Sequence, residues 1–199
     1  MKSLKSLEVL HQLSQKRILL FSPEEFRRVF GVSLDAAQAF IKSHKADLFV
    51  KLRNGLYGLR QNLPAETEIA NRLYTPSYLS LEYALAHYRI IPETVYAVTS
   101  VTTRVTRTFM VEGRLYEYSR IKRKAFTGYQ SQEASSGGVI LIAEPEKALA
   151  DYLYFVDLKL KPVNERMNLK GKVNAKVVRR YAKLFERRTL LDLVAKVLC

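Results

Sequence analysis

Two prolines, Pro76 and Pro92, bracket the segment that most restricts how this chain can fold. Proline cannot donate to a helical hydrogen-bond ladder and disfavours a helical conformation at the residue before it. Between the prolines, Ser80 is a candidate N-cap whose hydroxyl is expected to bond a backbone N–H of the first turn. Apolar residues then recur at helical spacing: Leu81, Ala84, Leu85 and Tyr88. We predict a helix here, between a helical region before it and a strand-rich region after it, which gives an α+β fold.

The region before Pro64 carries signals for three helices. A first helix is expected over residues 3–15, with Leu4, Leu7 and Leu10 facing inward and Val9 as a further candidate for that face. A second begins with a Ser-Pro-x-Glu pattern that suits a capping box with proline at the first helical position, and it ends at a glycine. The residues concerned are Ser22, Pro23, Glu25 and Gly31. Ser33 then caps a third helix, which runs from Leu34 to about His44.

A hairpin signal follows these helices. The apolar segments 48–52 and 56–59 flank Asn54-Gly55, a sequence that favours a tight turn between antiparallel strands. Two helices joined by a short glycine-containing turn, with a hairpin after them, form a winged helix-turn-helix. We therefore predict a DNA-binding domain of this kind over residues 1–62.

The third helix has two faces of different character. Ala37, Phe40, Ile41 and His44 share one face by their spacing, which leaves Asp35, Gln38, Lys42 and Lys45 on the other. In a major groove, a glutamine can bond an adenine edge and lysines can meet phosphates or guanine. Asp35 would accept from a cytosine amino group or only favour the helix start, and the whole face could instead be an ordinary solvated one. The candidate DNA-binding residues are Ser33, Asp35, Gln38, Lys42 and Lys45 on this helix, and Lys51, Arg53 and Asn54 on the hairpin.

After a short linker at Pro64, residues 63–199 predict a second domain with an antiparallel sheet flanked by helices. A helix is expected at 66–73, and strands at 95–103, 106–112 and 114–121. A further strand pair is expected around Ser135-Ser136-Gly137-Gly138, followed by a helix that opens at Glu144-Pro145-Glu146. If the third of these strands continues, Arg120, Lys122 and Lys124 share one face as an exposed row that protects a sheet edge. The tail from Val173 to Leu198 is expected to be helical.

Positive charge is concentrated at the two ends of the chain. Residues 1–60 hold 11 basic and 5 acidic side chains, residues 61–156 hold 10 of each, and residues 157–199 hold 12 and 4. A formal charge of +14 distributed in this way favours binding to a polyanion, and double-stranded DNA is the expected partner. A basic surface with no role in nucleic-acid binding is the alternative. In the tail, Lys176, Arg179, Arg180 and Lys183 form a band that could contact DNA or an acidic partner.

Three separated motifs occur along the chain. The first combines Pro-Ser-Tyr-Leu-Ser-Leu at 76–81, Ala-Leu at 84–85 and Ile-Pro-Glu at 91–93. The others are Gly-Leu-Tyr-Gly-Leu at 55–59 and Pro-Glu-Lys-Ala-Leu-Ala-Asp-Tyr-Leu-Tyr at 145–154. Together they resemble the AbiEi family, antitoxins of type IV toxin–antitoxin systems that act in abortive infection. Arg89 departs from the pattern, because the family more often has glycine there.

The resemblance implies a transcriptional repressor and antitoxin. The first domain would bind operator repeats near its own promoter, and the second would oppose an AbiEii-like nucleotidyltransferase toxin. A stand-alone regulator without a toxin, whose second domain binds a ligand or partner, is the main alternative.

The sequence predicts no enzyme. Glu144 and Glu146 beside Lys147 could hold a divalent cation as in metal-dependent nucleases, but acidic residues and a proline at a helix start are also ordinary dipole and capping features. The three histidines have no metal-ligand spacing, there is no glycine-rich phosphate loop, and Cys199 is the single cysteine. We expect no cofactor and no metal. With no long apolar run and no secretory segment, we also expect no membrane association and a cytoplasmic location.

Overall fold

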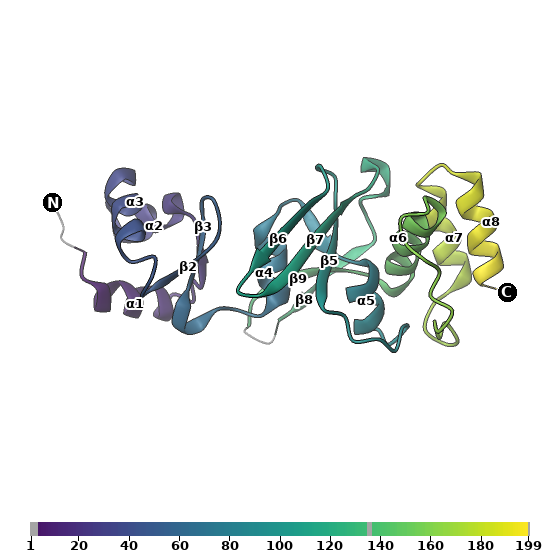
Figure 1. The fold of residues 1–199 in the computed structure, drawn as a ribbon, viewed down its shortest axis with the longest axis horizontal. Helices are drawn as coiled ribbons and strands as arrows, with labels where there is room; N and C mark the ends of the chain where they lie inside the picture. The colour runs from purple at the N-terminus through teal and green to yellow at the C-terminus, as the bar shows by residue number, and fades with distance from the viewer. Residues whose placement is uncertain (1–3, 135–136, 199) are drawn as a thin grey trace. The chain divides into compact units, whose positions relative to one another are not determined.

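The computed structural model describes residues 4–134 and 137–198, and these residues form an α+β protein with two separate sheets. The chain divides into two compact units, Met1–Ala65 and Glu66–Cys199, each described by itself below. Figure 1 labels their helices and strands. The turn predicted at Ser135-Ser136 and the cysteine at 199 lie outside the described residues.

The first unit contains three helices and a small antiparallel sheet. Its elements in order are α1 (Ser6–Gln15), β1 (Leu20–Phe21), α2 (Pro23–Phe30), α3 (Leu34–Ser43), β2 (Phe49–Arg53), β3 (Leu56–Leu59) and the 3₁₀ helix η1 (Arg60–Asn62). The predicted hairpin is confirmed: β2 and β3 pair antiparallel, with Gly55 in the connecting turn at φ 74°. Strand β1 was not predicted, since two residues are too short to show a period, and it pairs with the outer side of β3.

The local signals for α2 and α3 are confirmed in detail. Ser22 accepts from the backbone N–H of Glu25 at 3.2 Å, and the Glu25 carboxylate accepts from the Ser22 backbone at 2.7 Å. This reciprocal pair is the capping box. Gly31 ends α2 at φ 65°, a left-handed conformation that glycine adopts without strain. Ser33 then caps α3 by accepting from Ala36 N at 3.2 Å.

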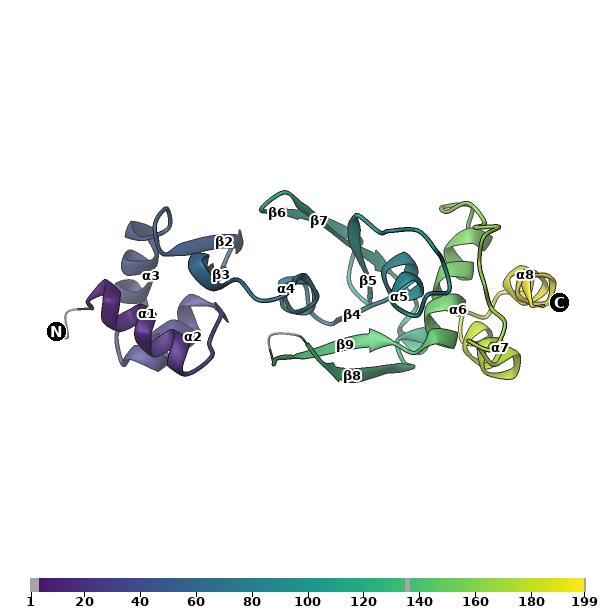
Figure 2. The same cartoon turned by 90° about the horizontal axis from the view of Figure 1, so that it is seen from below.

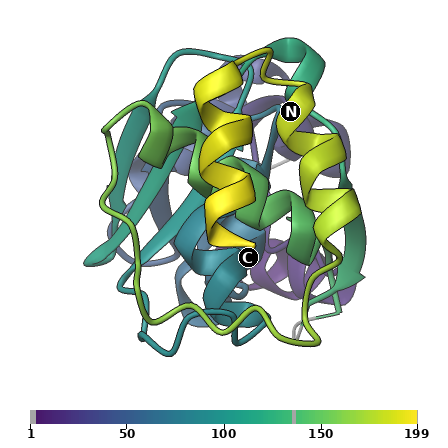
Figure 3. The same cartoon turned by 90° about the vertical axis from the view of Figure 1, so that its right-hand side faces the viewer.

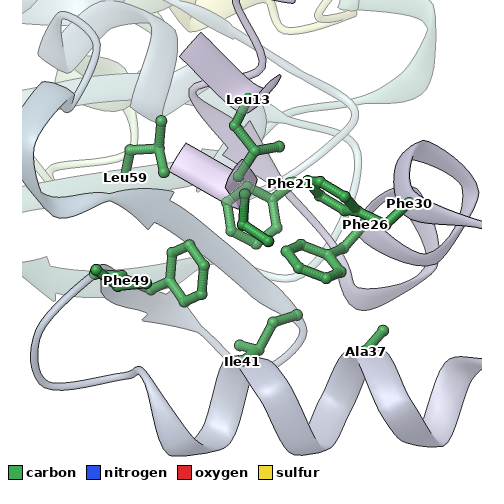
Figure 4. Close-up of a cluster of buried hydrophobic side chains, with 10 residues drawn as sticks. Leu13, Phe21, Phe26, Phe30, Ala37, Ile41, Phe49 and Leu59 are labelled. Carbon is green, nitrogen blue, oxygen red and sulfur yellow. The ribbon is translucent and has the colours of Figure 1, made fainter. Parts of the chain in front are cut away.

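An aromatic cluster forms the core of the first unit (Figure 4). The Phe21 ring lies 5.2 Å from Phe49, edge to face, and 5.6 Å from Phe26, and all three are fully buried. Helix α1 contributes Val9 and Leu13 to this core. The prediction that Leu7 faces inward was wrong, because its side chain is 81% exposed. A residue two positions away lies about 200° around the helix, so a face centred on Val9 turns Leu7 to solvent.

The second unit is built on a six-stranded sheet. Its elements are α4 (Glu66–Leu73), β4 (Ser77–Leu79), α5 (Leu81–His87), β5 (Ala97–Thr102), β6 (Arg107–Val111), β7 (Arg114–Arg120), the 3₁₀ helix η2 (Arg123–Ala125), β8 (Tyr129–Glu133), β9 (Val139–Ala143), α6 (Pro145–Asp157), α7 (Ala175–Lys183) and α8 (Arg188–Val197). Helix α4 packs on β4, β5 and β9, whereas α5 packs on β5 and α6 (Figure 2). The helices at 66–73 and from 145 and the three strands after Pro92 are therefore confirmed.

The prediction of an antiparallel sheet was wrong, because this sheet is mixed. Its order is β6-β7-β5-β4-β9-β8, in which β5 runs parallel to β7 and β4 runs parallel to β9. Strand β7 returns between β6 and β5, which leaves β6 at the edge. Strand β4 was missed, because only three residues separate its start from α5, yet it joins the two halves of the sheet.

The row of basic residues predicted on one strand is also wrong. Strand β7 ends at Arg120, and the chain turns into η2 rather than continuing along the sheet. The backbone N–H of Ile121 still bonds Thr102 O at 2.9 Å, but the Ile121 side chain is buried. The basic side chains that follow are exposed at the end of the sheet, and β7 is not an edge strand.

The tail predicted as one helix forms two. Helices α7 and α8 both pack on α6 and on each other (Figure 3). The break falls at Glu186, whose φ of 53° is incompatible with a right-handed helix. Val178, Tyr181, Ala182 and Phe185 are buried, so these residues form the inward face of α7 and of the segment that follows it. None of the helices in the described part of the chain combines the length and apolar character needed to cross a bilayer.

Candidate nucleic-acid interface

The candidate DNA-binding residues of α3 lie on its exposed side. Ala37 and Ile41 are buried in the core of the first unit, which fixes the rotation of the helix about its own axis. As a result Asp35, Gln38 and Lys42 are all exposed. The structure therefore gathers these three on one face, as their spacing predicted.

The end of α3 is held by a histidine. The ring of His44 stacks on Phe40 at 4.2 Å between centroids, and its Nε2 is 3.0 Å from the Ser6 hydroxyl on α1. Phe40 in turn packs against the core cluster. Lys45 follows this anchor in the turn after the helix, where it is exposed. The anchor thus holds α3 against α1 without using any of the exposed polar side chains.

The hairpin residues are less uniform. Lys51 and Asn54 are exposed, whereas Arg53 is half-buried and donates from Nη1 to the backbone oxygen of Asn54 at 2.7 Å. This bond holds the guanidinium of Arg53 over its own turn. Lys51 pairs with Tyr57 across the ladder and is free of that constraint. Lys51 and Asn54 are accordingly the hairpin side chains best placed to meet an external partner.

In the second unit, the predicted basic band is exposed on α7: Lys176, Arg179, Arg180 and Lys183. The guanidinium of Arg180 lies over the ring of Tyr181, 5.4 Å from its centroid. Tyr181 donates to the Glu144 carboxylate at 2.6 Å, and burial together with that carboxylate raises the pKa of Tyr181. The band is therefore attached to the start of α6 through Tyr181.

A buried polar cluster in the second unit was not predicted. Lys147 and Asp151 form an ion pair one turn apart in α6, and neither has any exposed side-chain surface. The Asp151 carboxylate also accepts hydrogen bonds from the Tyr78 hydroxyl at 3.1 Å and the Ser80 hydroxyl at 2.8 Å. Burial lowers the pKa of Lys147 and raises the pKa of Asp151, since both charged forms lose hydration. In the sequence, this cluster was indicated only by the i,i+4 spacing of a lysine and an aspartate inside an otherwise apolar helix.

This cluster overturns the predicted role of Ser80. Its hydroxyl bonds Asp151 rather than the first turn of α5, and no side-chain cap is formed there. Thr99 takes that place, because its hydroxyl accepts from Tyr83 N at 3.0 Å and donates to Ser80 O at 2.7 Å. A threonine from the neighbouring strand therefore completes the helix start.

The nuclease alternative finds no gathered carboxylates at the start of α6. Glu144 accepts from Tyr181, and Glu146 accepts from the backbone N–H of Asn174 at 2.9 Å. Lys147 points instead to Asp151 and lies 4.8 Å from the Phe185 ring centroid. Across residues 4–134 and 137–198, no group of three or more His, Cys, Asp or Glu side chains is arranged to hold a metal ion.

Comparison with known proteins adds no identification to this geometry. No protein-family model matches the chain, and no curated protein sequence matches it.

Proposed function

We propose that this protein is a DNA-binding transcriptional regulator whose first unit is a winged helix-turn-helix. In this proposal α3 is the recognition helix, and the β2–β3 hairpin is the wing that reaches the backbone or the minor groove. The observation that carries the proposal is the exposed polar face of α3, with Gln38 and Lys42 on it, next to a hairpin that presents Lys51. The net charge of +6 over residues 1–60 supports it, because phosphate neutralisation dominates affinity for DNA.

Helix α3 is also held in place by the rest of the unit, as a recognition helix must be. Its cap at Ser33, its buried residues and the His44 anchor use side chains other than those of the polar face. The polar face therefore loses no interaction within the protein when it enters a groove. Asp35 would lie at the start of the helix, where its carboxylate interacts favourably with the helix dipole. There it could also accept a hydrogen bond from a cytosine amino group.

The direct experiment is a mobility-shift titration of the full chain on duplexes from the region upstream of its own gene. We expect saturable binding to repeated sequences that survives an excess of unrelated duplex. The double replacement of Lys42 and Lys45 by Glu should abolish it, whereas the same change at Lys159 and Lys170, exposed elsewhere in the chain, serves as the control for charge. Equal binding to operator and unrelated DNA would contradict the proposal.

We further propose, on the resemblance to AbiEi antitoxins, that the second unit opposes a nucleotidyltransferase-like toxin. The two longer motifs of that resemblance support one another physically, because Tyr78 and Ser80 from the first bond Asp151 from the second. Each unit would be expressed separately, as residues 1–65 or 66–199, with a nucleotidyltransferase encoded next to this gene. Growth should be rescued by residues 66–199, and rescue by residues 1–65 alone would contradict this division of roles.

A stand-alone regulator without a toxin is the second candidate. It is favoured by a pocket in the second unit whose lining includes Arg120, Lys122 and Arg123, since a regulator can be controlled by a ligand bound there. The neighbouring gene separates the two candidates. A nucleotidyltransferase gene beside this one favours the antitoxin, and its absence favours the stand-alone regulator.

A further inference from the structure

A pocket opens at one end of the parallel strand pair β5 and β7. Thr102 and Arg120 are paired at the carboxyl ends of these strands, and the chain beyond each strand forms the pocket wall. The cavity measures about 470 Å³ and is lined by Thr103, Arg120, Ile121, Lys122, Arg123 and Tyr154. Ligands of open sheets with parallel strands bind beyond the carboxyl ends of those strands, and pockets for small ligands measure about 300–1,000 Å³. The place and the size of this pocket both suit a small ligand.

The lining carries three cationic side chains and no carboxylate. Within the described residues, the guanidinium groups of Arg120 and Arg123 have no carboxylate partner. Lys122 lies 3.7 Å from Glu186, but Lys124 holds the same carboxylate at 2.7 Å, so one negative charge is shared by two lysines. The pocket therefore keeps an excess of positive charge. Guanidinium groups match phosphate oxygens in geometry as well as in charge.

The lining also contains an aromatic ring. Tyr154 lies on α6 and stacks on Phe185, with ring centroids 4.2 Å apart and an interplanar angle of 20°. Phe185 is fully buried, so this stacking restricts the Tyr154 ring. A restrained ring beside cationic groups is the combination that binds a planar base together with its phosphates.

We propose that this pocket binds a small phosphorylated ligand with a planar ring, of the nucleoside diphosphate class. Its phosphates would lie against Arg120, Lys122 and Arg123, and its ring system against Tyr154. The site lies wholly in the second unit and uses none of the residues assigned to DNA binding. It therefore goes beyond the proposed function, and ligand binding tests it directly.

The test uses calorimetric titration of the full chain with ADP and, separately, with inorganic tripolyphosphate. Both should bind with one site per chain. Arg120→Gln and Arg123→Gln should each weaken both ligands about tenfold or more, because each removes charge-assisted bonds to phosphate. Both arginines are exposed, so the variants should keep their fold, which circular dichroism checks. Arg188→Gln is the matched control, since it removes an exposed arginine on α8 that does not line the pocket.

The aromatic part of the proposal is tested at Tyr154. Tyr154→Leu should weaken ADP by about fivefold or more and leave tripolyphosphate unchanged, whereas Tyr154→Phe should keep ADP binding. Equal losses for the two ligands would overturn the assignment of a planar ring. Loss of ADP binding in Arg188→Gln as large as in Arg123→Gln would overturn the pocket itself. Full displacement of ADP by an unrelated duplex would assign these cations to nucleic acid instead.

Discussion

The Tyr78 hydroxyl donates a hydrogen bond of 3.1 Å to Asp151, and so joins β4 to α6 across 73 residues of sequence. The same carboxylate is paired with Lys147 and bonded by Ser80. Strand β4, the start of α5 and helix α6 therefore meet at one buried negative charge. The short strand β4 is held in the middle of the sheet by this cluster as well as by its ladder.

We expect Asp151→Asn to destabilise the protein by about 3–5 kcal/mol, because it leaves the Lys147 ammonium buried without a counter-charge. The double variant with Lys147→Met should lose less than Asp151→Asn alone, since no buried cation remains. Urea unfolding of the two single variants and the double variant measures this coupling. Equal losses in Asp151→Asn and in the double variant would show that the ion pair does not determine the cost.

We expect Gln38→Ala to relax sequence preference at one base pair of the operator, at a cost of about 1–3 kcal/mol on the preferred site. Lys45→Ala should instead weaken all duplexes alike and lower the salt dependence by roughly one phosphate contact. Mobility shifts on operator variants at several salt concentrations separate the two effects. The control is Gln12→Ala, which changes an exposed glutamine on α1. An unchanged sequence preference in Gln38→Ala would show that this face of α3 does not contact the bases.

The basic band on α7 allows a test of how far the DNA footprint extends. Replacing Lys176, Arg179, Arg180 and Lys183 by Gln should reduce the slope of log affinity against log salt if the band meets phosphates. The same number of charges can be removed elsewhere in the tail as a control, at Lys159, Lys170, Arg188 and Lys196, all of which are exposed. An unchanged slope together with lost binding to a protein partner would assign the band to that partner.

Arg89 adopts φ 56°, a left-handed conformation that strains any residue with a Cβ. This is the position at which the AbiEi pattern more often has glycine. We expect Arg89→Gly to stabilise the protein by up to about 1 kcal/mol, because relief of strain exceeds the added entropy of the unfolded chain. Lys172 bonds the backbone oxygen of Arg89, and that contact survives the change. Arg89→Ala should give no such gain, and a lower urea midpoint for Arg89→Gly would contradict the argument.

Burial raises the pKa of several tyrosines, and it raises the pKa of Tyr116 to about 12. Burial also raises the pKa of Tyr78 and of Tyr83, and in both a nearby carboxylate adds to the effect. The folded state then holds more protons than the unfolded state above about pH 10, so this stability contribution is complete below pH 10 and is lost as pH rises. Urea midpoints between about pH 9 and pH 11 should fall accordingly. Tyr116→Phe should make the fall shallower, and an unchanged dependence would contradict this assignment.

Short-range signals in the sequence determined the first unit almost completely. The capping box of Ser22 and Glu25, the left-handed Gly31 and the cap at Ser33 each depend on residues within one turn of chain. The exposed face of α3 follows from the period of its apolar residues, so the candidate DNA-binding side chains could be named from the sequence. Strand β1 was missed because two residues are too short to show a period, and Leu7 was placed inward because a leucine-rich helix leaves the period ambiguous.

Tertiary structure decided the second unit, where the determining contacts join residues far apart in sequence. Ser80 lies at a helix start, but its hydroxyl bonds a buried carboxylate 71 residues away, because a buried carboxylate that lacks a hydrogen bond would cost more than a missing cap. The sequence does not predict that β5 pairs parallel with β7, because the alternation of apolar residues along a strand is the same whichever way the strand runs. The packing of α6 likewise places Tyr154 in the same pocket as Arg120. Local propensity specifies where helices and strands begin and end, whereas long-range packing decides which side chains meet.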